Sequence, residues 1–230
     1  MVQNASTALG LASPSTVISN TSQAQMLSLL QQEGADLISR GQWRVLRRRN
    51  TFTLSTASTN QGAMQGTVVT ASDFDYMLPG TFWNLTLKQV ILGEISAESE
   101  EAQVAIGVSG PFQQFAIRGG NLYIFPQPPS ADSTAFEYIS KFYAKTSGGV
   151  LKSAFTIDTD LGVLSEGLME LGLIWRWKRA NGLDYAQEFT TYEERVQNAL
   201  TRDAGGMTLR MDGPPPYIGG IVIPIGSWNL

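Results

Sequence analysis

The pattern of apolar and polar positions changes period twice along the chain and divides it into regions of helix and strand. Between residues 21 and 41, apolar residues recur every three or four positions, which predicts an amphipathic helix with one buried face. Thr21 or Ser22 can cap its start, and Gly41 is expected to end it in the left-handed conformation. Residues 1–20 are small, polar and weakly periodic, and they predict an extended arm or a short helical lead-in.

From about residue 43, apolar and polar residues instead alternate at every second position. Segments 43–56, 81–96 and 134–146 alternate and are rich in β-branched and aromatic residues, as strands are. Two more short strands are expected on either side of Gly119-Gly120, because glycine accepts the positive φ of a tight hairpin. With no long helix between them, these strands indicate an antiparallel sheet or a small sandwich.

Two segments inside this region are expected not to be strands. ASDFDYMLPG at 71–80 predicts a single helical turn, because Pro79 disfavours helix at Leu78 and blocks a continuation. SAESEEA at 96–102 predicts a solvated acidic turn.

Helical spacing returns near Asp160 and continues to about Asp203, with a break at residues 181–183. A glycine followed by an apolar residue is typical of the Schellman ending, and Asp184 can cap a second helix, with Gln187 in the capping-box position. These signals predict a hairpin of two helices. The core faces are expected at Leu164, Leu168, Leu171 and Trp175 on the first helix, and at Tyr185, Phe189, Tyr192, Val196 and Leu200 on the second.

Two features of the hairpin bear on function. Trp175 and Trp177 lie about 200° apart around the helix. We expect the core to take Trp175, and Trp177 to pack against another element or a neighbouring subunit. The helix carries three cations in its last turns, Arg176, Lys178 and Arg179. We interpret them as charges that interact favourably with the negative C-terminal end of the helix dipole, and not as phosphate ligands.

The dense basic run RVLRRR covers residues 44–49. In a strand that begins at Trp43, Arg47 and Arg49 point to one face and Arg48 to the other, which indicates an exposed or interface strand. We consider three roles for this basic run: contact with DNA, protection of a sheet edge, and contact with a neighbouring subunit. The last two are weighted equally.

The final segment, 206–230, is rich in glycine and proline but also strongly apolar. Three consecutive prolines forbid helix, so this tail is expected to be extended. Because it cannot bury its apolar side chains against itself, a neighbouring subunit is favoured over its own domain as the surface that covers it. Its candidate contacts are Pro214, Pro215, Pro216, Tyr217, Ile221, Ile223 and Trp228.

Composition restricts the chemistry. The 230 residues are 43% hydrophobic, 10% aromatic and 16% charged, which is typical of a folded protein with little charge. The absence of cysteine and histidine rules out disulfides, thiolate nucleophiles, Ser-His-Asp triads and His-ligated metals. We therefore expect no enzyme, with a carboxylate-based glycan hydrolase as the remote exception, and no cofactor.

A calcium site at Asp158 and Asp160 fails the EF-hand pattern, which would place Val163 where glycine and Met169 where glutamate is required. Helix capping is the expected role of these two aspartates. No metal site is predicted.

Charge and hydropathy restrict the partners. The net charge of −4 argues against sequence-specific DNA binding, which normally uses a positive excess. No run of 18 apolar residues is present, and the N-terminus lacks the basic region of a signal peptide. We expect a soluble protein that is made inside a cell and does not enter a membrane.

Three segments in order carry a family resemblance: LSLLQQEGADLISRGQWRVL, GGNLYIFPQPPSADSTAFEYISKFYA at 119–144, and residues 155–206 with the WRWKRANGLDYAQEF hairpin. Together they cover about two-thirds of the chain. They resemble the head-to-tail adaptor proteins of tailed bacteriophages, the group that includes tail tubular protein A and the gatekeepers. The match is one of pattern and carries no catalytic signature.

The resemblance implies a structural virion protein assembled in the cytoplasm of the bacterial host. About a dozen copies would form a homo-oligomeric, dodecameric ring below the portal protein. That ring would extend the channel for genomic DNA and dock the next tail component, a nozzle or a tail tube. Another tail-tube or tail-completion protein, and an interaction module related to helical repeats, are the alternatives.

The expected fold class is α+β. An N-terminal arm and helix (1–42) and a C-terminal helical hairpin (150–205) would form one helical bundle. An antiparallel β-domain (43–149) would be inserted between them, and an extended tail (206–230) would follow.

Overall fold

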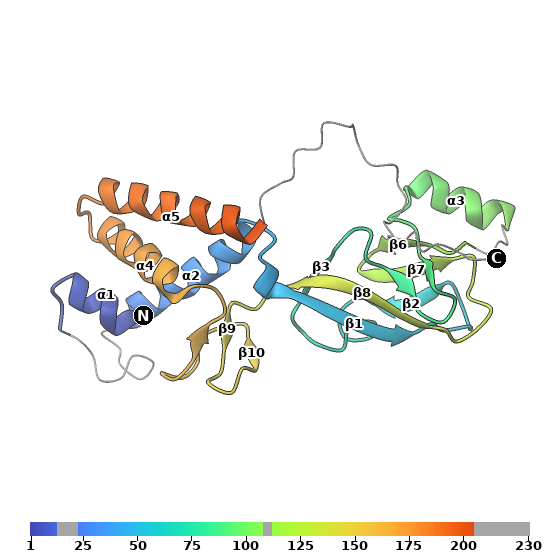
Figure 1. Cartoon of the computed structure of the whole chain (residues 1–230), viewed down its shortest axis with the longest axis horizontal. Coiled ribbons are helices and arrows are strands. Elements are labelled where there is room, and N and C mark those ends of the chain that lie inside the picture. The colour runs from blue at the N-terminus through green and yellow to red at the C-terminus, as the bar shows by residue number, and fades with distance from the viewer. Residues whose placement is uncertain (13–22, 108–111, 205–230) are drawn as a thin grey trace, which may run out of the picture.

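Most of the helices lie at one end of an elongated molecule and most of the strands at the other (Figure 1). The computed structural model describes residues 1–12, 23–107 and 112–204. These form a mixed α+β protein with antiparallel sheets, in agreement with the predicted class. The helices of this part are α1 (Val2–Ala8), α2 (Ala24–Ser39), α3 (Ala97–Ile106), α4 (Glu166–Ala180) and α5 (Ala186–Ala204), with a 3-10 turn η2 at Arg44–Leu46.

The strands form three small sheets. The largest has the order β1-β8-β4-β5, with β3 also paired to β8; the others have the orders β2-β7-β6 and β10-β9-β11. The bounds are β1 (Arg47–Thr53), β2 (Asn60–Ala63), β3 (Phe74–Met77), β4 (Trp83–Asn84), β5 (Gln89–Val90), β6 (Gln114–Arg118), β7 (Asn121–Phe125), β8 (Ser133–Ser140), β9 (Ala144–Lys145), β10 (Leu151–Lys152) and β11 (Leu161–Gly162).

Two hydrophobic cores lie at the two ends of the molecule. The helical core joins α1, α2, α4 and α5 with the small β9 sheet, and its most deeply buried residues include Leu37, Met169 and Tyr192. The β core lies among the other two sheets and contains Phe82 and Phe136. Residue 149, where the sequence places a boundary, lies between β9 and β10 of a sheet that packs with the helices.

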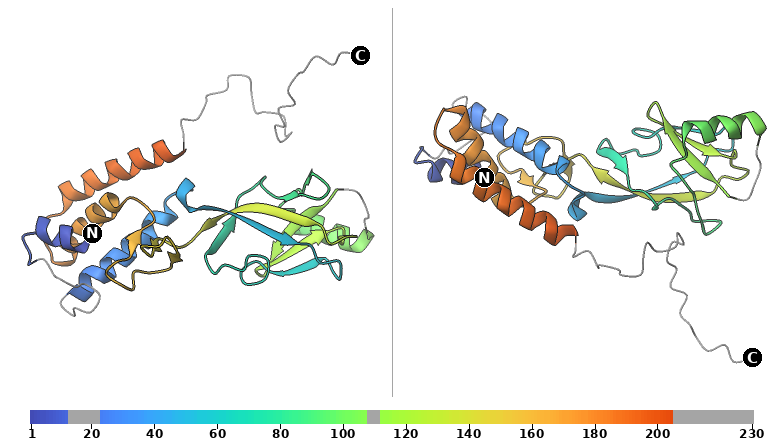
Figure 2. Two further views of the ribbon diagram at one scale, coloured as in Figure 1. Left: turned by 60° about the horizontal axis from the view of Figure 1, so that its bottom comes forward. Right: turned by 90° about the horizontal axis from the view of Figure 1, so that it is seen from above.

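β1 and β8 connect the two ends. Their antiparallel register runs from Arg47 opposite Ile139 to Thr53 opposite Ser133. Near the helices, β3 pairs with the other side of β8. Figure 2 shows this narrow sheet from two sides, with α1, α2, α4, α5 and the small β9 sheet at one end of it, and α3 and the β2-β7-β6 sheet at the other. We call the junction of η2, the start of β1 and the end of β8 the waist.

The predicted helical hairpin and its turn are confirmed, but Tyr185 and Phe189, which were expected on the core face of the second helix, are 36% and 37% exposed. Gly182 has φ +69°, its N–H donates to Arg179 O at 3.1 Å, and the Leu183 N–H donates to Lys178 O at 2.9 Å. These are the two hydrogen bonds of a Schellman motif. Asp184 Oδ1 accepts the N–H of Ala186, the first residue of α5, at 3.1 Å.

The short lead-in helix and the glycine hairpin are also confirmed. α1 occupies residues 2–8, and β6 and β7 meet at Gly119-Gly120, both with positive φ. Two residues with positive φ in a two-residue loop match the right-handed twist of the flanking strands.

The helical turn predicted at 71–80 is wrong. Residues Phe74–Met77 form β3, with a register shift between Phe74 and Tyr76. Pro79 favours extended backbone at the preceding residue, and Leu78 N donates to Glu137 O at 2.8 Å, so pairing with β8 extends up to the proline.

The single strand expected at 81–96 is interrupted. Asn84 Oδ1 accepts the N–H groups of Thr86 and Leu87 at 3.0 and 2.9 Å, which turns the chain between β4 and β5. These side-chain hydrogen bonds compete with the backbone hydrogen bonds of a strand, and the alternating sequence pattern gives no sign of them.

The acidic turn expected at 96–102 is also wrong, because these residues begin α3. Ser96 accepts the N–H of Ser99 at 3.3 Å, and Gly107 ends the helix with φ 65°. Serine and glycine at these two positions are standard helix boundaries.

Two expectations around Gly41 need correction. The residue before it, Arg40, has φ −75°, and Gly41 is not among the residues with positive φ. A Cβ at this position would lie 2.6 Å from Leu200 Cδ2, so the end of the Leu200 side chain would have to shift. The strand expected from Trp43 begins only at Arg47, since residues 44–46 form η2, so Arg44 and Leu46 do not share a strand face with Arg48.

The caps Thr21 and Ser22 and the whole tail, including Pro214, Pro215, Pro216, Tyr217, Ile221, Ile223 and Trp228, lie outside the described residues. Within the described part, no helix combines the length and the apolar character that crossing a membrane requires.

Candidate functional site

An open groove lies at the waist, between the end of α5, the η2 turn and the loop that precedes α4. Its volume is ≈ 700 Å³. We call it the waist groove, and its lining residues are Trp43, Val45, Val163, Leu164, Ser165, Leu168, Arg195, Asn198, Ala199, Arg202 and Asp203.

The waist groove combines apolar walls with cations. Val45 is 47% exposed, which is unusual for a valine beside a core. Arg195 and Arg202 are exposed and lie seven residues apart, which places them on the same side of α5. Neither arginine forms an ion pair with another residue that the structure describes. The groove therefore suits an apolar protrusion that carries negative charge.

Two contacts fix the walls of the groove. Asp203 Oδ2 accepts the backbone N–H of Arg44 at 2.6 Å, which ties the end of α5 to η2. Trp43 is buried, and its Nε1 donates to Leu37 O at 2.7 Å. The groove is thus preformed by elements far apart in the sequence.

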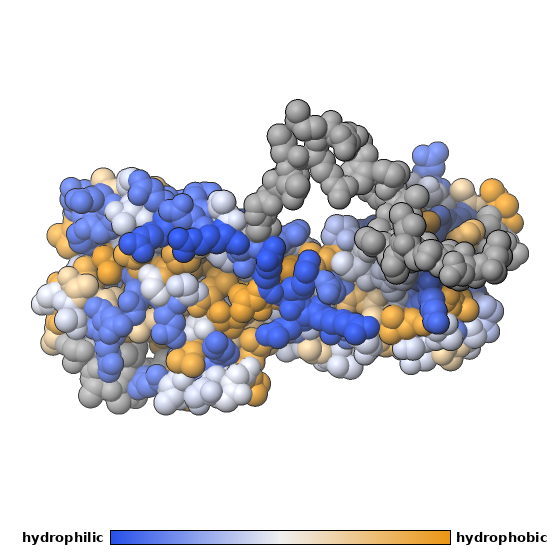
Figure 3. All heavy atoms as spheres, viewed as in Figure 1, coloured by the Kyte–Doolittle hydropathy of each residue, from blue (hydrophilic) through white to orange (hydrophobic). Residues whose placement is uncertain are grey.

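The three candidate arginines of β1 do not line this groove, and Arg49 lines a separate hollow with Thr81 and Glu137. Arg47, Arg48 and Arg49 are all exposed, and β1 is an edge strand that pairs only with β8. Arg47 Nε lies 3.1 Å from Glu137 Oε2 in a solvent-exposed pair that contributes little stability. Figure 3 shows hydrophilic side chains running across the waist. Edge protection and a subunit contact both remain consistent with this placement.

Trp177 is only partly exposed and packs against the helical core from the outer side of α4. Trp175 is buried, and its ring lies 5.1 Å from Phe189 and 6.0 Å from Tyr192, measured between centroids. Trp175 lies in the core as expected, whereas Trp177 packs against the edge of that same core, and its contact with a neighbouring subunit stays a prediction. The structure does not bring Trp177 into the waist groove.

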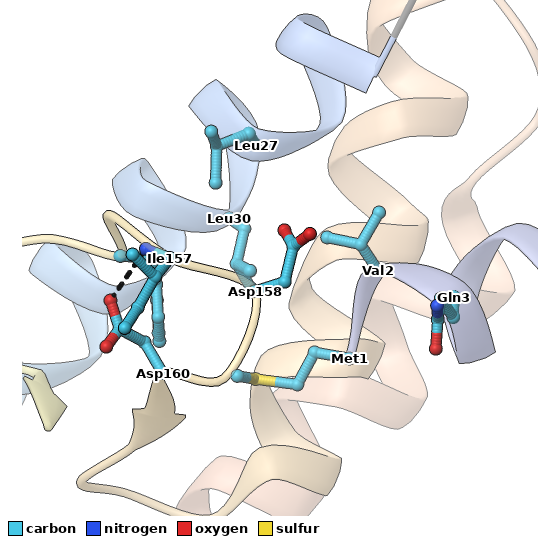
Figure 4. A pocket seen from close by; sticks show the side chains of 9 residues that line it. Met1, Val2, Gln3, Leu27, Leu30, Ile157, Asp158 and Asp160 are labelled. Atoms are coloured by element: carbon cyan, nitrogen blue, oxygen red, sulfur yellow. Dashed lines mark hydrogen bonds between the residues drawn. The ribbon is translucent and has the colours of Figure 1, made fainter. Parts of the chain in front are cut away.

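A small cavity of ≈ 110 Å³ lies between α1, α2 and the Phe155–Asp160 loop (Figure 4). Asp160 Oδ2 accepts from Lys152 Nζ at 2.6 Å and from the N–H groups of Thr156 and Ile157 at 2.7 and 3.0 Å. Burial would raise the pKa of Asp160, but these hydrogen bonds outweigh it and lower the pKa to about 2.

The role predicted for Asp158 and Asp160 is wrong, because α4 begins after Ser165 and neither aspartate caps it. Asp160 instead anchors the loop that precedes β11. In the described residues no group of three acidic side chains is placed to hold a metal ion.

A buried carboxylate joins three helices. Glu33 of α2 is fully buried, accepts the Tyr192 hydroxyl on Oε1, and accepts Arg176 Nε on Oε2 at 2.7 Å. Burial raises the pKa of Glu33, although the hydrogen bonds from Tyr192 and Arg176 oppose that shift. Gly172 leaves room for the carboxylate, since a Cβ there would lie 2.1 Å from Glu33 Cδ.

Sequence reasoning missed both this buried network and the groove. Glu33 could have been found from its position on the apolar face of a helix. Burying an unpaired carboxylate there raises the free energy of the fold, so a buried partner is expected. The groove had no local signal, because its walls come from segments about 150 residues apart in the sequence.

Comparison with known proteins adds no relative. No protein-family model matches this chain, and no curated protein matches its sequence. Functional inference therefore depends on the described surfaces and on the sequence pattern.

Proposed function

We propose that this chain is a structural virion protein, a head-to-tail connector subunit that forms a ring below the portal, extends the DNA channel and docks the tail. The waist groove carries this proposal. This preformed apolar groove carries two arginines that form no ion pair with a described residue, and no described residue covers it, which supports a role in binding a protein partner.

The arrangement of the chain supports the same function. Segments from both ends of the sequence pack into one helical region, and the β region projects away from it. In this proposal residues 1–42 and 150–205 act as one helical bundle, 43–149 as an inserted β-domain, and 206–230 as an extended tail that reaches a neighbouring subunit.

The proposed partners are further copies of the chain in a dodecameric ring, the portal protein, and a nozzle or tail tube. Genomic DNA would pass through the ring without sequence-specific contacts, and the net charge of −4 would not retard it. No catalytic step and no cofactor belong to this function. The particle would be assembled in the host cytoplasm.

Native mass spectrometry and electron microscopy test the proposal directly. We expect a ring, either from the purified chain alone or on addition of purified portal rings. A chain that remains monomeric at high concentration and ignores the portal would contradict the proposal.

A different role in the same particle, as a tail-tube or tail-completion protein, is the second candidate. It predicts binding to tail components and not to the portal. A helical-repeat module is less favoured, because such repeats must stack to bury their faces, and the described residues contain one α4–α5 hairpin.

A further inference from the structure

Helix α3, at the far end of the β region, has an inverted pattern of burial. Its buried residue is an acid, Glu100, whereas Val104 and Ile106 are 61% and 75% exposed. Phe112, which follows the helix, is 65% exposed. A helix in a monomer normally buries its apolar residues. Val104 and Ile106 lie about 200° apart around α3, so apolar side chains are exposed on both sides of the helix end, which indicates a surface for a partner.

Polar contacts hold this helix in place with its apolar end outward. Arg118 Nη1 lies 3.1 Å from Glu100 Oε1 and 3.7 Å from Glu101 Oε1, and Gln103 donates to Gln114. α3 is therefore fastened to β6 without using Val104 or Ile106. Figure 3 shows apolar side chains at this end of the molecule.

The outward side of α3 also carries negative charge. Glu98 and Glu101 are exposed and lie three residues apart, so they share a side of the helix, and Val104 follows three residues later. We call Glu98, Glu101, Val104, Ile106 and Phe112 the acidic tip. Its carboxylates lie in the first half of α3, and its apolar side chains lie at and after the end of the helix.

The acidic tip complements the waist groove in shape and charge. The groove is concave, has apolar walls and carries Arg195 and Arg202, whereas the tip is convex and apolar and carries Glu98 and Glu101. Opposite charges around a shared apolar contact favour specific association and suppress wrong partners.

The two surfaces cannot meet within one chain, because the β region separates them in every view (Figures 1 and 2). We propose that the acidic tip of one copy docks in the waist groove of the next copy. Because each chain has one of each surface, the contact is head-to-tail and repeats until a ring closes. This inference rests on the proposed connector ring and names the surfaces that build it.

Two double variants test the contact. The tip variant, Ile106→Ser with Phe112→Ser, removes the apolar protrusion, and the groove variant, Arg195→Glu with Arg202→Glu, reverses the charge of its receptor. All four positions are exposed, so both variants are expected to fold and to melt like the wild type. Matched controls are Val150→Ser, at an equally exposed valine, and Arg179→Glu, at an exposed arginine outside the groove.

Native mass spectrometry and analytical ultracentrifugation give the readout. We expect the wild type and both controls to assemble, and each double variant alone to bind itself about 100-fold more weakly and remain monomeric. An equimolar mixture of the two double variants should form a 1:1 dimer and nothing larger. In that mixture one intact tip meets one intact groove, and the other two surfaces are damaged.

A charge exchange provides a second measurement. Glu98→Arg, which leaves the contacts of Arg118 in place, should weaken assembly alone, and should restore it in part when combined with the groove variant in one chain. Restoration requires direct contact between the two surfaces, which a general loss of folding cannot imitate.

The outcomes separate this inference from the proposed function. A ring that survives both double variants, or two monomeric variants that form no mixed dimer, would overturn the tip-in-groove contact and leave the connector proposal standing. A wild type that never assembles, even with portal rings, would overturn both. Loss of portal binding with intact self-assembly would assign the surfaces to the portal and also overturn the inference.

Discussion

The helical core and the β core of this protein are stabilised in different ways. The β core is apolar and is built around a cluster of aromatic rings: the Phe82 centroid lies 5.3 Å from that of Phe115 and 5.5 Å from that of Phe136. The helical core contains a buried polar network, in which Glu33 contacts Arg176 and Tyr192 across 143 and 159 residues of sequence. Apolar packing depends mainly on filled volume, whereas a buried polar network requires its hydrogen-bond partners at fixed positions, so the two ends should respond to different kinds of substitution.

The largest expected effect is in the β core. Phe82→Ala should destabilise this region by about 4 kcal/mol, because a fully buried phenyl ring is lost and a cavity remains. Hydrogen exchange should show faster exchange in β6, β7 and β8 and unchanged protection in α4 and α5. The control Leu85→Ala, at a 40% exposed leucine, should cost less than about 0.5 kcal/mol. Equal loss of protection in the helices would mean that the two cores unfold as one unit.

In the helical core, Gly172→Ala should cost about 3 kcal/mol, because the added Cβ would overlap the Glu33 carboxylate. The matched control is Gly167→Ala in the same helix, where the nearest atom, Ser165 Oγ, lies 3.8 Å from the added Cβ. That control should stabilise the protein by about 0.5 kcal/mol through helix propensity. Thermal melts of the two variants measure the difference, and similar melting temperatures would show that Gly172 does not make room for the carboxylate.

The third effect depends on pH. Asp160 has its pKa lowered from 3.8 to about 2, so its contribution to stability is present above pH 3.8 and is lost as the pH falls through 2. Asp160→Asn should cost about 2 kcal/mol at pH 7 and almost nothing below pH 2. Denaturant unfolding across this range is the measurement. A cost that stays constant with pH would show that the charge of Asp160 is not what anchors the loop.

The stability contributed by Glu33 should change with pH in the opposite direction to that contributed by Asp160. Its pKa is raised above 4.5, so its contribution is fully present below pH 4.5 and is lost as the pH rises through the folded-state pKa. Glu33→Gln should remove this part of the pH dependence, although it weakens the bond to Arg176. If the two variants change the pH profile in the same direction, the sign assigned to one of them is wrong.

The smallest effect concerns the hairpin. Gly182→Ala should cost about 1 kcal/mol, because alanine is strained at a φ of +69°, and Gly182→Asn should cost less. Neither variant should change the protection of the β core. A neutral Gly182→Ala would show that the Schellman turn contributes little to the helical end.

The sequence predicted those elements whose signals are local. The α4–α5 hairpin and the β6–β7 hairpin are each defined by glycine next to clear periodicity, and both are confirmed. Helix α3 also had local boundaries in Ser96 and Gly107, but its acidic residues favoured a solvated turn. β3 failed for another reason, since its pairing with β8 involves residues more than 60 positions away.

The candidate site was predictable only in part. Arg47, Arg48 and Arg49 were identified by their charge, and their exposure agrees with an edge strand. The waist groove could not be predicted, because in the sequence residues such as Val45 and Leu168 do not differ from ordinary core residues. Only the folded arrangement brings them to one surface. Concave surfaces assembled from distant segments have no signature in a linear pattern.

The waist has a mechanical consequence. The chain enters the β region through β1 and leaves it through β8, and at this point the sheet is one layer thick, with β3 as its third strand. A pull between the two ends is carried along two covalent strands side by side, and their mutual hydrogen bonds, which lie across the strands, bear little of it. A force perpendicular to the sheet meets only this single layer. The molecule should therefore be stiff against stretching along the two strands and should bend more easily about the waist, in the direction perpendicular to the sheet.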